Sequence, residues 1–202
     1  MVIGVFGGAG SGKSAVLRIL KNKYKAYVLE ADKIAHSLYR KHQPGYEAVK
    51  RICGKGILDE NREIDRKKLG AILFSDRKKM EEVNAAIHPM VDHKTRMLSE
   101  NYFARKKRGI LVYEAALLPG SYDFFDSVWY VYTSEPVRRQ RLKETRGYSD
   151  EKIDSVLMNQ PSEQEFFDAA DIVIDNNKSR EELEKEIAAA MKKTTDRSNA
   201  KC

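Results

Sequence analysis

The sequence predicts an α/β protein in which a mostly parallel β-sheet is covered by helices on both faces. Three observations support this fold class. Short runs rich in β-branched and aromatic residues recur along the chain, segments with helical spacing of apolar residues separate them, and a glycine-rich segment directly follows the first run. Strands that alternate with helices are typical of parallel sheets, because a parallel connection needs a crossover that is usually helical.

The strands and helices are expected in a definite order. The first predicted strand covers residues 2–6, and a helix over 14–20 follows it after the glycines. Four more short apolar runs predict strands at 26–29, 110–113, 128–133 and 172–174. Ser179 and Glu182 form a capping box that opens a final helix with a repeating apolar face, and this helix is expected to close the sheet.

Two stretches of the chain have helical patterns and no good strand. The pattern of residues from about 33 to 107 predicts a helical insert. The pattern from about 135 to 170, which is rich in charge, predicts a helical lid. A polar tail is expected over about 193–202. Because no repeat and no Gly/Ser linker is visible, we expect one domain over 1–202 that includes the insert, the lid and the tail.

The charge of the chain is concentrated in one region. The 202 residues include 37 Lys and Arg against 30 Asp and Glu, a formal net charge of +7. Residues 33–108 hold 19 of the basic and 10 of the acidic residues, whereas the rest of the chain is slightly acidic. A basic segment of this kind favours a polyanionic partner, either a nucleic acid or a small molecule with several phosphates.

Hydropathy and cysteine content indicate the cellular compartment in which the protein is expected to work. No apolar run approaches the ~18 residues that a membrane span requires, and the N-terminal segment lacks the pattern of a signal peptide. We therefore expect a cytoplasmic protein that does not bind a membrane. Cys53 and Cys202 are too few for a disulfide framework or a cysteine-based zinc site, so both thiols are expected to be free.

The glycine-rich segment carries the chemical signal of the sequence. Residues 7–14 read Gly-Gly-Ala-Gly-Ser-Gly-Lys-Ser, which satisfies the P-loop pattern and stands between a predicted strand and a predicted helix. Backbone N–H groups at a helix N-terminus can wrap a phosphate chain only where side chains do not block the approach, so glycines are needed. The predicted nucleotide contacts are Gly8, Gly10, Ser11, Gly12, Lys13, Ser14 and Ala15, with the Ser14 hydroxyl as a ligand of Mg²⁺.

The P-loop predicts nucleotide binding, but the reaction in which the nucleotide is used must be inferred from other parts of the chain. A guanine-specific switch protein would carry Asn-Lys-x-Asp, whereas Asn177 and Lys178 are followed by Ser179 and Arg180. A motor or helicase would usually be longer. The fold class is therefore a P-loop NTPase-type α/β sheet with a helical acceptor-binding insert and a helical lid, which fits a small kinase. The alternatives are a kinase of another small acceptor, such as a nucleoside monophosphate, and a nucleic-acid-binding P-loop ATPase.

From residue 2 to about residue 190, the sequence resembles the dephospho-CoA kinase family. The resemblance rests on the P-loop, Glu30-Ala31-Asp32, His88-Pro89, Ala116-Leu117-Leu118, Arg141, Gln160 and the segment 170–177. It implies that ATP, with Mg²⁺, phosphorylates the ribose 3′-hydroxyl of dephospho-CoA. It also implies that Asp32 is the catalytic base, that His88 and Leu117 contact the acceptor, and that Asn176 lies near the adenine of ATP.

The sequence departs from the family pattern at three places. Glu30 replaces an aspartate, Ala116 replaces a proline, and Thr145 stands where the family often has a second lid arginine, with Arg146 next to it. We expect Arg141, within a helical run, to stabilise the transition state. Arg146 is expected in a turn before Gly147, where it would make a weaker contact with the ATP phosphates.

Four further expectations complete the site. A carboxylate at a strand end, such as that of Asp32, lies where α/β sheets bind ligands, and an acceptor hydroxyl needs a base to take its proton. The predicted catalytic residues are Lys13, Asp32 and Arg141. Glu114 could act on Mg²⁺ through water or be an ordinary loop acid. His88 and His93 lack the spacing of a metal site. The partner is expected to be a small molecule and not a nucleic acid, with a monomer favoured.

Overall fold

The computed structural model describes residues 1–118 and 121–200. The chain forms two compact units. The first consists of Met1–Leu29 together with Arg108–Cys202, and the second is Glu30–Lys107. The second unit covers the stretch for which the sequence predicts an insert; the assignment of the whole chain to one domain stays a prediction.

The first unit is built on a parallel sheet with the strand order β2-β3-β1-β4-β5. The strands are β1 (Val2–Phe6), β2 (Tyr27–Glu30), β3 (Leu111–Ala115), β4 (Ser127–Tyr132) and β5 (Ile172–Asp175). In the centre, β1 pairs with both β3 and β4, so that Phe6 lies opposite Ala115 and Tyr130. Because the strands are parallel, the loops that follow β1, β3, β4 and β5 leave from the same edge of the sheet.

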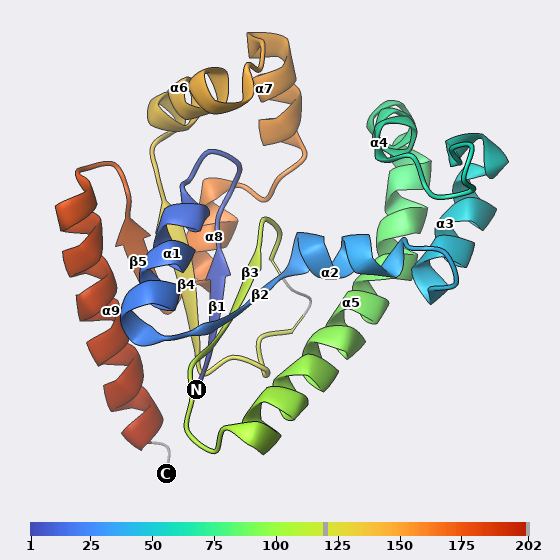
Figure 1. Cartoon of the computed structure of the whole chain (residues 1–202). Coiled ribbons are helices and arrows are strands. Elements are labelled where there is room, and N and C mark those ends of the chain that lie inside the picture. Colours follow the sequence, from blue (N-terminus) through green and yellow to red (C-terminus); the bar gives the residue numbers. More distant parts are fainter. Residues whose placement is uncertain (119–120, 201–202) are drawn as a thin grey trace. The chain divides into compact units, whose positions relative to one another are not determined.

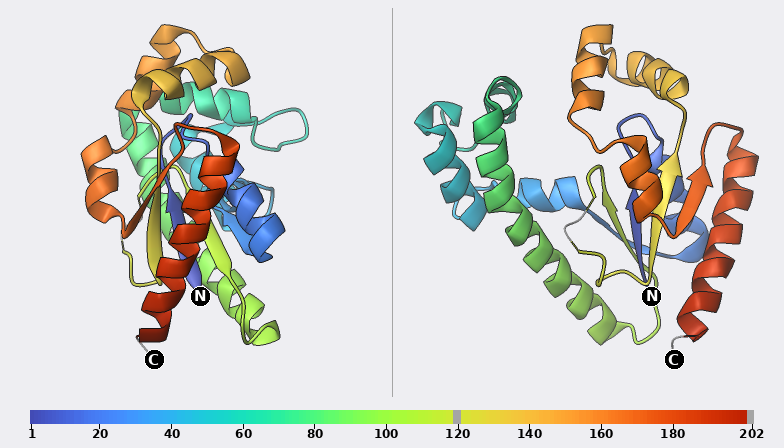
Figure 2. Two further views of the ribbon diagram at one scale, coloured as in Figure 1. Left: turned by 90° about the vertical axis from the view of Figure 1, so that its left-hand side faces the viewer. Right: turned by 180° about the vertical axis from the view of Figure 1, so that it is seen from behind.

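Helices cover both faces of this sheet, as expected. α1 (Lys13–Tyr24) and α9 (Arg180–Ala200) pack against one face around the buried side chains of Ile3, Trp129 and Ile187. α8 (Glu163–Ala169) covers the other face, where the ring of Phe166 stacks on that of Tyr130 with centroids 4.9 Å apart. Trp129 and Tyr130 thus point to opposite faces, as neighbouring strand residues must. The two layers are visible in Figure 2.

The predicted lid segment is helical. After β4 the chain forms α6 (Glu135–Arg146) and α7 (Asp150–Met158), which pack on each other beyond the carboxyl ends of the strands (Figure 1). α6 ends at Gly147, which adopts a left-handed conformation with φ 62° and donates its N–H to the carbonyls of Leu142 and Lys143. Ser162 and Glu165 form the predicted capping box at the start of α8.

The second unit is a helical assembly on one long helix. α2 (Ala31–Leu38), α3 (Pro44–Cys53) and α4 (Arg66–Ser75) pack against α5 (Arg77–Arg105). A 3₁₀ turn, Lys55–Ile57, and an isolated antiparallel bridge between Leu58 and Ile64 connect α3 to α4. Asp65 and Asp76 cap α4 and α5 by accepting backbone N–H groups, which explains where these two helices begin.

The C-terminal segment differs from its expected form. The sequence predicts a polar tail from about 193, but α9 continues to Ala200. Thr194 is fully buried, and its hydroxyl oxygen accepts a hydrogen bond of 3.1 Å from the indole N–H of Trp129. One buried threonine therefore anchors about two helical turns beyond residue 193. The polar composition of this segment does not reveal that contact.

The expectations about membrane spans and free thiols can be compared with the described residues. No helix within the described residues is long and apolar enough to cross a membrane. Cys53 is a free thiol, as predicted, while Cys202 lies outside the described residues.

Candidate active site

The P-loop occupies the turn between the end of β1 and the start of α1. Gly10 and Gly12 have φ values of 79° and 85°, which side chains rarely adopt, and a Cβ on Gly10 would lie 2.8 Å from the carbonyl oxygen of Arg138. Gly12 is the N-cap of α1 and provides no side-chain cap. The first N–H groups of α1 are therefore available to an anion, which the helix dipole also favours.

Lys13 is held by two partners at the start of α1. Its ammonium group donates to the carbonyl oxygen of Gly7 at 2.6 Å and lies 3.4 Å from the carboxylate of Glu114. Glu114 comes from β3, directly beside Val5 of β1, and both charged side chains are largely buried. The sheet thus fixes a positive charge at the loop. The sequence analysis left two roles open for Glu114, an action on Mg²⁺ through water and that of an ordinary loop acid. The geometry adds a third role, which is to hold Lys13.

The hydroxyl groups of the P-loop differ in their surroundings. The Ser14 side chain is exposed near the start of α1. Ser11 is buried, and its hydroxyl has no hydrogen-bond partner among the described residues. A buried polar atom without a partner is unusual, and a bound ligand at the loop would satisfy it.

Three side chains from distant segments converge on the carbonyl oxygen of Ser11. The Asn176 amide donates to it at 2.8 Å, the Thr133 hydroxyl at 2.9 Å and the Arg141 guanidinium at 3.5 Å. Arg141 also donates to the carbonyl of Asn176 at 2.9 Å. The structure therefore brings two predicted site residues, Arg141 and Asn176, together under the P-loop, and adds Thr133, which the sequence analysis missed.

Arg138 is a second residue that the sequence analysis missed. Its Nε donates to the carbonyl of Ala9 at 2.8 Å, and its Nη2 donates at 3.0 Å to the amide oxygen of Gln160. The same Gln160 oxygen accepts the N–H of Ala9 at 3.0 Å. The available signal was helical spacing, because Arg138 precedes Arg141 by three residues and so lies on the same face of α6.

The guanidinium of Arg138 is in an unusual environment for a charge. Burial lowers the pKa of this guanidinium from its ordinary value. Among the described residues no carboxylate forms an ion pair with it. A partly buried cation beside the P-loop, with no carboxylate of the described residues within ion-pair distance, is suited to an anionic ligand.

Arg146 corrects one expectation. The sequence placed it in a turn, but it is the last residue of α6, because the left-handed Gly147 ends the helix only after it. Its guanidinium lies 5.8 Å from the centre of the Tyr148 ring.

The remaining predicted residues are distributed over both units. Leu117 follows β3 in the first unit and is 38% exposed. Asp32 is exposed in the first turn of α2, and His88 is exposed within α5; both belong to the second unit. In the part of the chain that the structure describes, no group of three or more His, Cys, Asp or Glu side chains could hold a metal ion.

The parallel sheet, the P-loop after its central strand and the arginine-bearing helix α6 define a protein of the P-loop kinase class. A family model described as dephospho-CoA kinase matches residues 1–182. The dephospho-CoA kinase of Aquifex aeolicus is 38% identical over 199 residues, which cover 96% of this chain and 97% of the relative. The chain belongs to the dephospho-CoA kinase family.

Solved structures agree with this fold. A Thermus thermophilus protein superposes with a TM-score of 0.77 and 27% identity, covering 96% of this chain and 97% of that one. A dephospho-CoA kinase from Campylobacter jejuni gives a TM-score of 0.63 with 22% identity over 95% of both chains. At that identity the second likeness shows the fold alone.

Proposed function

We propose that this protein transfers the γ-phosphate of ATP to the 3′-hydroxyl of dephospho-CoA, giving CoA and ADP. The observation that carries the proposal is the match of the dephospho-CoA kinase family model over residues 1–182 to a chain whose P-loop is fully formed. The strongly basic stretch 33–108 supports the same acceptor, because dephospho-CoA contains a diphosphate.

The P-loop binds the phosphates of ATP in this proposal. The backbone N–H groups from Gly8 to Ala15 surround the phosphate chain, and Lys13 places its charge at the β- and γ-phosphates. The Ser14 hydroxyl and the Glu114 carboxylate are oxygen ligands of the kind that Mg²⁺ prefers, so this chain fits the ion that the family implies. Bound there, Mg²⁺ would neutralise charge on the transferring phosphate.

Asp32 removes the proton from the acceptor hydroxyl. Its carboxylate is exposed in the first turn of α2, a helix that begins directly after the sheet strand β2. An aligned carboxylate of this kind makes the hydroxyl oxygen a better nucleophile as the bond to phosphorus forms. His88 and Leu117 are proposed contacts of the acceptor, on the family resemblance alone.

The helices that follow β4 close over the ATP phosphates. Arg141 stabilises the charge on the transferring phosphoryl group, Arg146 contacts the ATP phosphates and Asn176 lies near the adenine. The contacts of Arg138 with Ala9 and Gln160 support a further role, in which Arg138 joins the lid to the P-loop. Closure excludes water, so that phosphate passes to the hydroxyl and not to solvent.

We also propose that the protein works in the cytoplasm as a monomer on small-molecule substrates, without a nucleic acid or a membrane as partner. Its helices in the described residues include none that could span a bilayer, and its basic surface is assigned to the acceptor.

An acceptor panel tests the proposed function. Purified protein is mixed with Mg-ATP and one acceptor at a time, namely dephospho-CoA, AMP, CMP or shikimate, and ADP release is measured. Dephospho-CoA should give the highest kcat/KM by a wide margin, and mass spectrometry should identify CoA as the product. Lys13→Ala serves as the control for contaminating kinases. A higher kcat/KM for a nucleoside monophosphate would establish the alternative kinase instead.

A further inference from the structure

Thr133 connects the parallel sheet to the P-loop at a fully buried position. It directly follows β4, and Asn176 directly follows the neighbouring strand β5. Tyr132 is paired with Asp175 at the ends of these strands, so the register places Thr133 and Asn176 side by side. Thr133 is 0% exposed and Asn176 is 6% exposed. Two rigid strand ends therefore present a hydroxyl and an amide at a position that excludes water.

The Thr133 hydroxyl and the Asn176 amide share one acceptor, the Ser11 carbonyl. The hydroxyl donates to this oxygen at 2.9 Å and the amide donates at 2.8 Å. A carbonyl oxygen has two lone pairs, so these two donors satisfy it. Across a trans peptide, the C=O of one residue and the N–H of the next point in opposite directions. The N–H of Gly12 is therefore directed away from Thr133 and Asn176.

Arg141 of α6 contacts the same group of atoms. Its Nη1 donates to the Thr133 hydroxyl oxygen at 3.3 Å, and its Nη2 donates to the carbonyl oxygen of Asn176 at 2.9 Å. The distance from Nη1 to the Ser11 carbonyl oxygen is longer, 3.5 Å. The Thr133 oxygen thus accepts from the arginine and donates to the P-loop. A guanidinium has five N–H donors, so an arginine held by these two contacts can still donate to phosphate.

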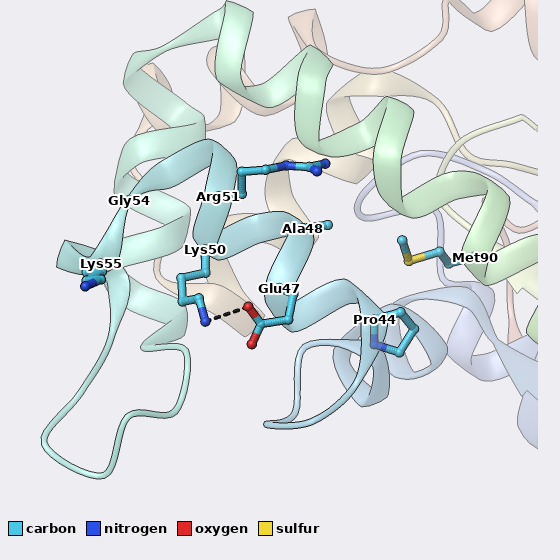
Figure 3. Close-up of a pocket in the computed structure, with 8 residues that line it drawn as sticks. All are labelled: Pro44, Glu47, Ala48, Lys50, Arg51, Gly54, Lys55 and Met90. Carbon is cyan, nitrogen blue, oxygen red and sulfur yellow. Dashed lines mark ion pairs between the residues drawn. The ribbon is translucent and has the colours of Figure 1, made fainter.

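A cavity in the second unit shows the opposite situation for polar side chains (Figure 3). It has a volume of about 550 Å³, and Lys50 and Glu47 in its lining form an ion pair at 2.6 Å. The Glu47 side chain is 64% exposed, so water competes for both partners. Arg51 and Lys55 of the same lining are also exposed. Exposed charges of this kind exchange partners with water, whereas water cannot replace the buried Thr133 hydroxyl.

We propose that Thr133 is a positioning residue of the kinase reaction, which sets the orientation of the Arg141 guanidinium against the P-loop. The inference rests on the proposed function, because it takes Arg141 as the group that stabilises the transferring phosphoryl group. An arginine stabilises a transition state best when its donors are already oriented before charge develops, since no reorganisation is then needed. The Thr133 hydroxyl provides this orientation from the rigid end of β4, and it acts through Arg141 and the Ser11 carbonyl.

A double-mutant cycle between Thr133→Val and Arg141→Lys tests the inference. Thr133→Val keeps the shape of the side chain and removes the hydroxyl, so kcat should fall by about tenfold, the equivalent of one hydrogen bond. Thr133→Ser restores the hydroxyl and should return kcat to within about twofold of the parent value. In the Arg141→Lys background, Thr133→Val should change kcat by less than about twofold, because the guanidinium that it positions is already absent.

Thr145→Val is the matched control on α6. The Thr145 hydroxyl is exposed and donates to the carbonyl oxygen of Arg141 at 2.6 Å. Its removal changes a contact of the same arginine without affecting the guanidinium, so kcat should stay unchanged. Circular dichroism checks that every variant is folded at the assay temperature. If Thr133→Val does not fold, Thr133→Cys takes its place in the cycle, since a thiol is a weak hydrogen-bond donor.

The inference is overturned if the losses of kcat in Thr133→Val and Arg141→Lys multiply in the double variant, because the threonine would then act independently of the arginine. It is also overturned if Thr133→Ser or Thr145→Val is as slow as Thr133→Val. A parent protein that does not phosphorylate dephospho-CoA would refute the proposed function itself. The same cycle is then measured on the Kd of a non-hydrolysable ATP analogue, where coupled losses support the positioning role and independent losses overturn it.

Discussion

Lys13 and Asp32 should fail in different ways when they are replaced. Lys13→Ala removes the charge at the transferring phosphate and leaves the largely buried Glu114 without its ion-pair partner, so turnover should collapse and ATP binding should weaken. Asp32→Asn keeps the shape of the side chain and loses the proton acceptor. It should lower kcat by ~10² or more while ATP binds normally. Steady-state kinetics with calorimetric titration of an ATP analogue measures both effects.

An Asp32→Asn variant with near-normal turnover would contradict the assignment of the base. Glu30 would then be the first candidate to replace it, although its carboxylate accepts a hydrogen bond of 2.7 Å from Lys33.

The contact between Trp129 and Thr194 is expected to stabilise the fold. Thr194→Val would leave the indole N–H unpaired in a fully buried position, which should reduce the free energy of unfolding by about 1–3 kcal/mol. Urea denaturation followed by Trp129 fluorescence measures the change. Thr195→Val is the matched control, since its hydroxyl donates only within α9, to the carbonyl of Met191 at 2.9 Å. Equal losses in the two variants would show that the hydrogen bond to Trp129 is not the cause.

At the scale of a single element, α6 carries four arginines with different surroundings. Arg141→Lys should depress kcat strongly, because a lysine cannot copy the paired donors of a guanidinium. Arg138→Lys should also lower kcat, since it breaks the contacts with Ala9 and Gln160. Arg146→Lys should mainly raise the KM for ATP. Initial rates at varied ATP concentration separate these effects.

Arg139→Lys is the control for this series. Arg139 stands next to Arg138 on α6 but pairs with Glu135 at 2.7 Å, and no contact with the P-loop is present among the described residues. Its replacement should leave kcat and KM unchanged. A larger kcat loss for Arg146→Lys than for Arg141→Lys would exchange the roles proposed for these two residues.

The elements themselves were largely predictable from local pattern. The predicted strand at 2–6 is β1, and the other four strands agree with the structure to within two residues at each end. The predicted capping boxes at Ser162 and Ser179 are confirmed. They were predictable because each depends on two residues that are only three positions apart. The expectation that Arg146 lies in a turn was wrong, because α6 stays helical up to Arg146 and ends at the left-handed Gly147.

At the scale of the whole molecule, the basic region suits either a small polyanion or a nucleic acid, so its partner separates the proposed kinase from a nucleic-acid-dependent ATPase. The basic residues concentrate in 33–108, and the rest of the chain is slightly acidic. If this surface serves a small polyanion, dephospho-CoA should stimulate ADP release from ATP, and DNA or RNA should not. Initial rates with each addition, at low and at physiological salt, measure this. Stimulation by nucleic acid without stimulation by dephospho-CoA would contradict the kinase proposal.

The sequence by itself determined the features that depend on neighbours along the chain. The P-loop is eight consecutive residues between a strand and a helix, so its pattern and its position were both readable. The family resemblance indicated Arg141, Gln160 and Asn176 but not what they touch.

Only the tertiary structure decided how the site is braced. The Ser11 carbonyl accepts hydrogen bonds from Thr133 and Asn176, which follow it by 122 and 165 positions, and Arg138 reaches Ala9 across 129 positions. No local pattern encodes such contacts, because they arise when parallel strands end at one edge and when helices pack on a shared partner. Sequence therefore indicated which groups are expected to bind phosphate, and packing determined which distant side chains hold those groups in place.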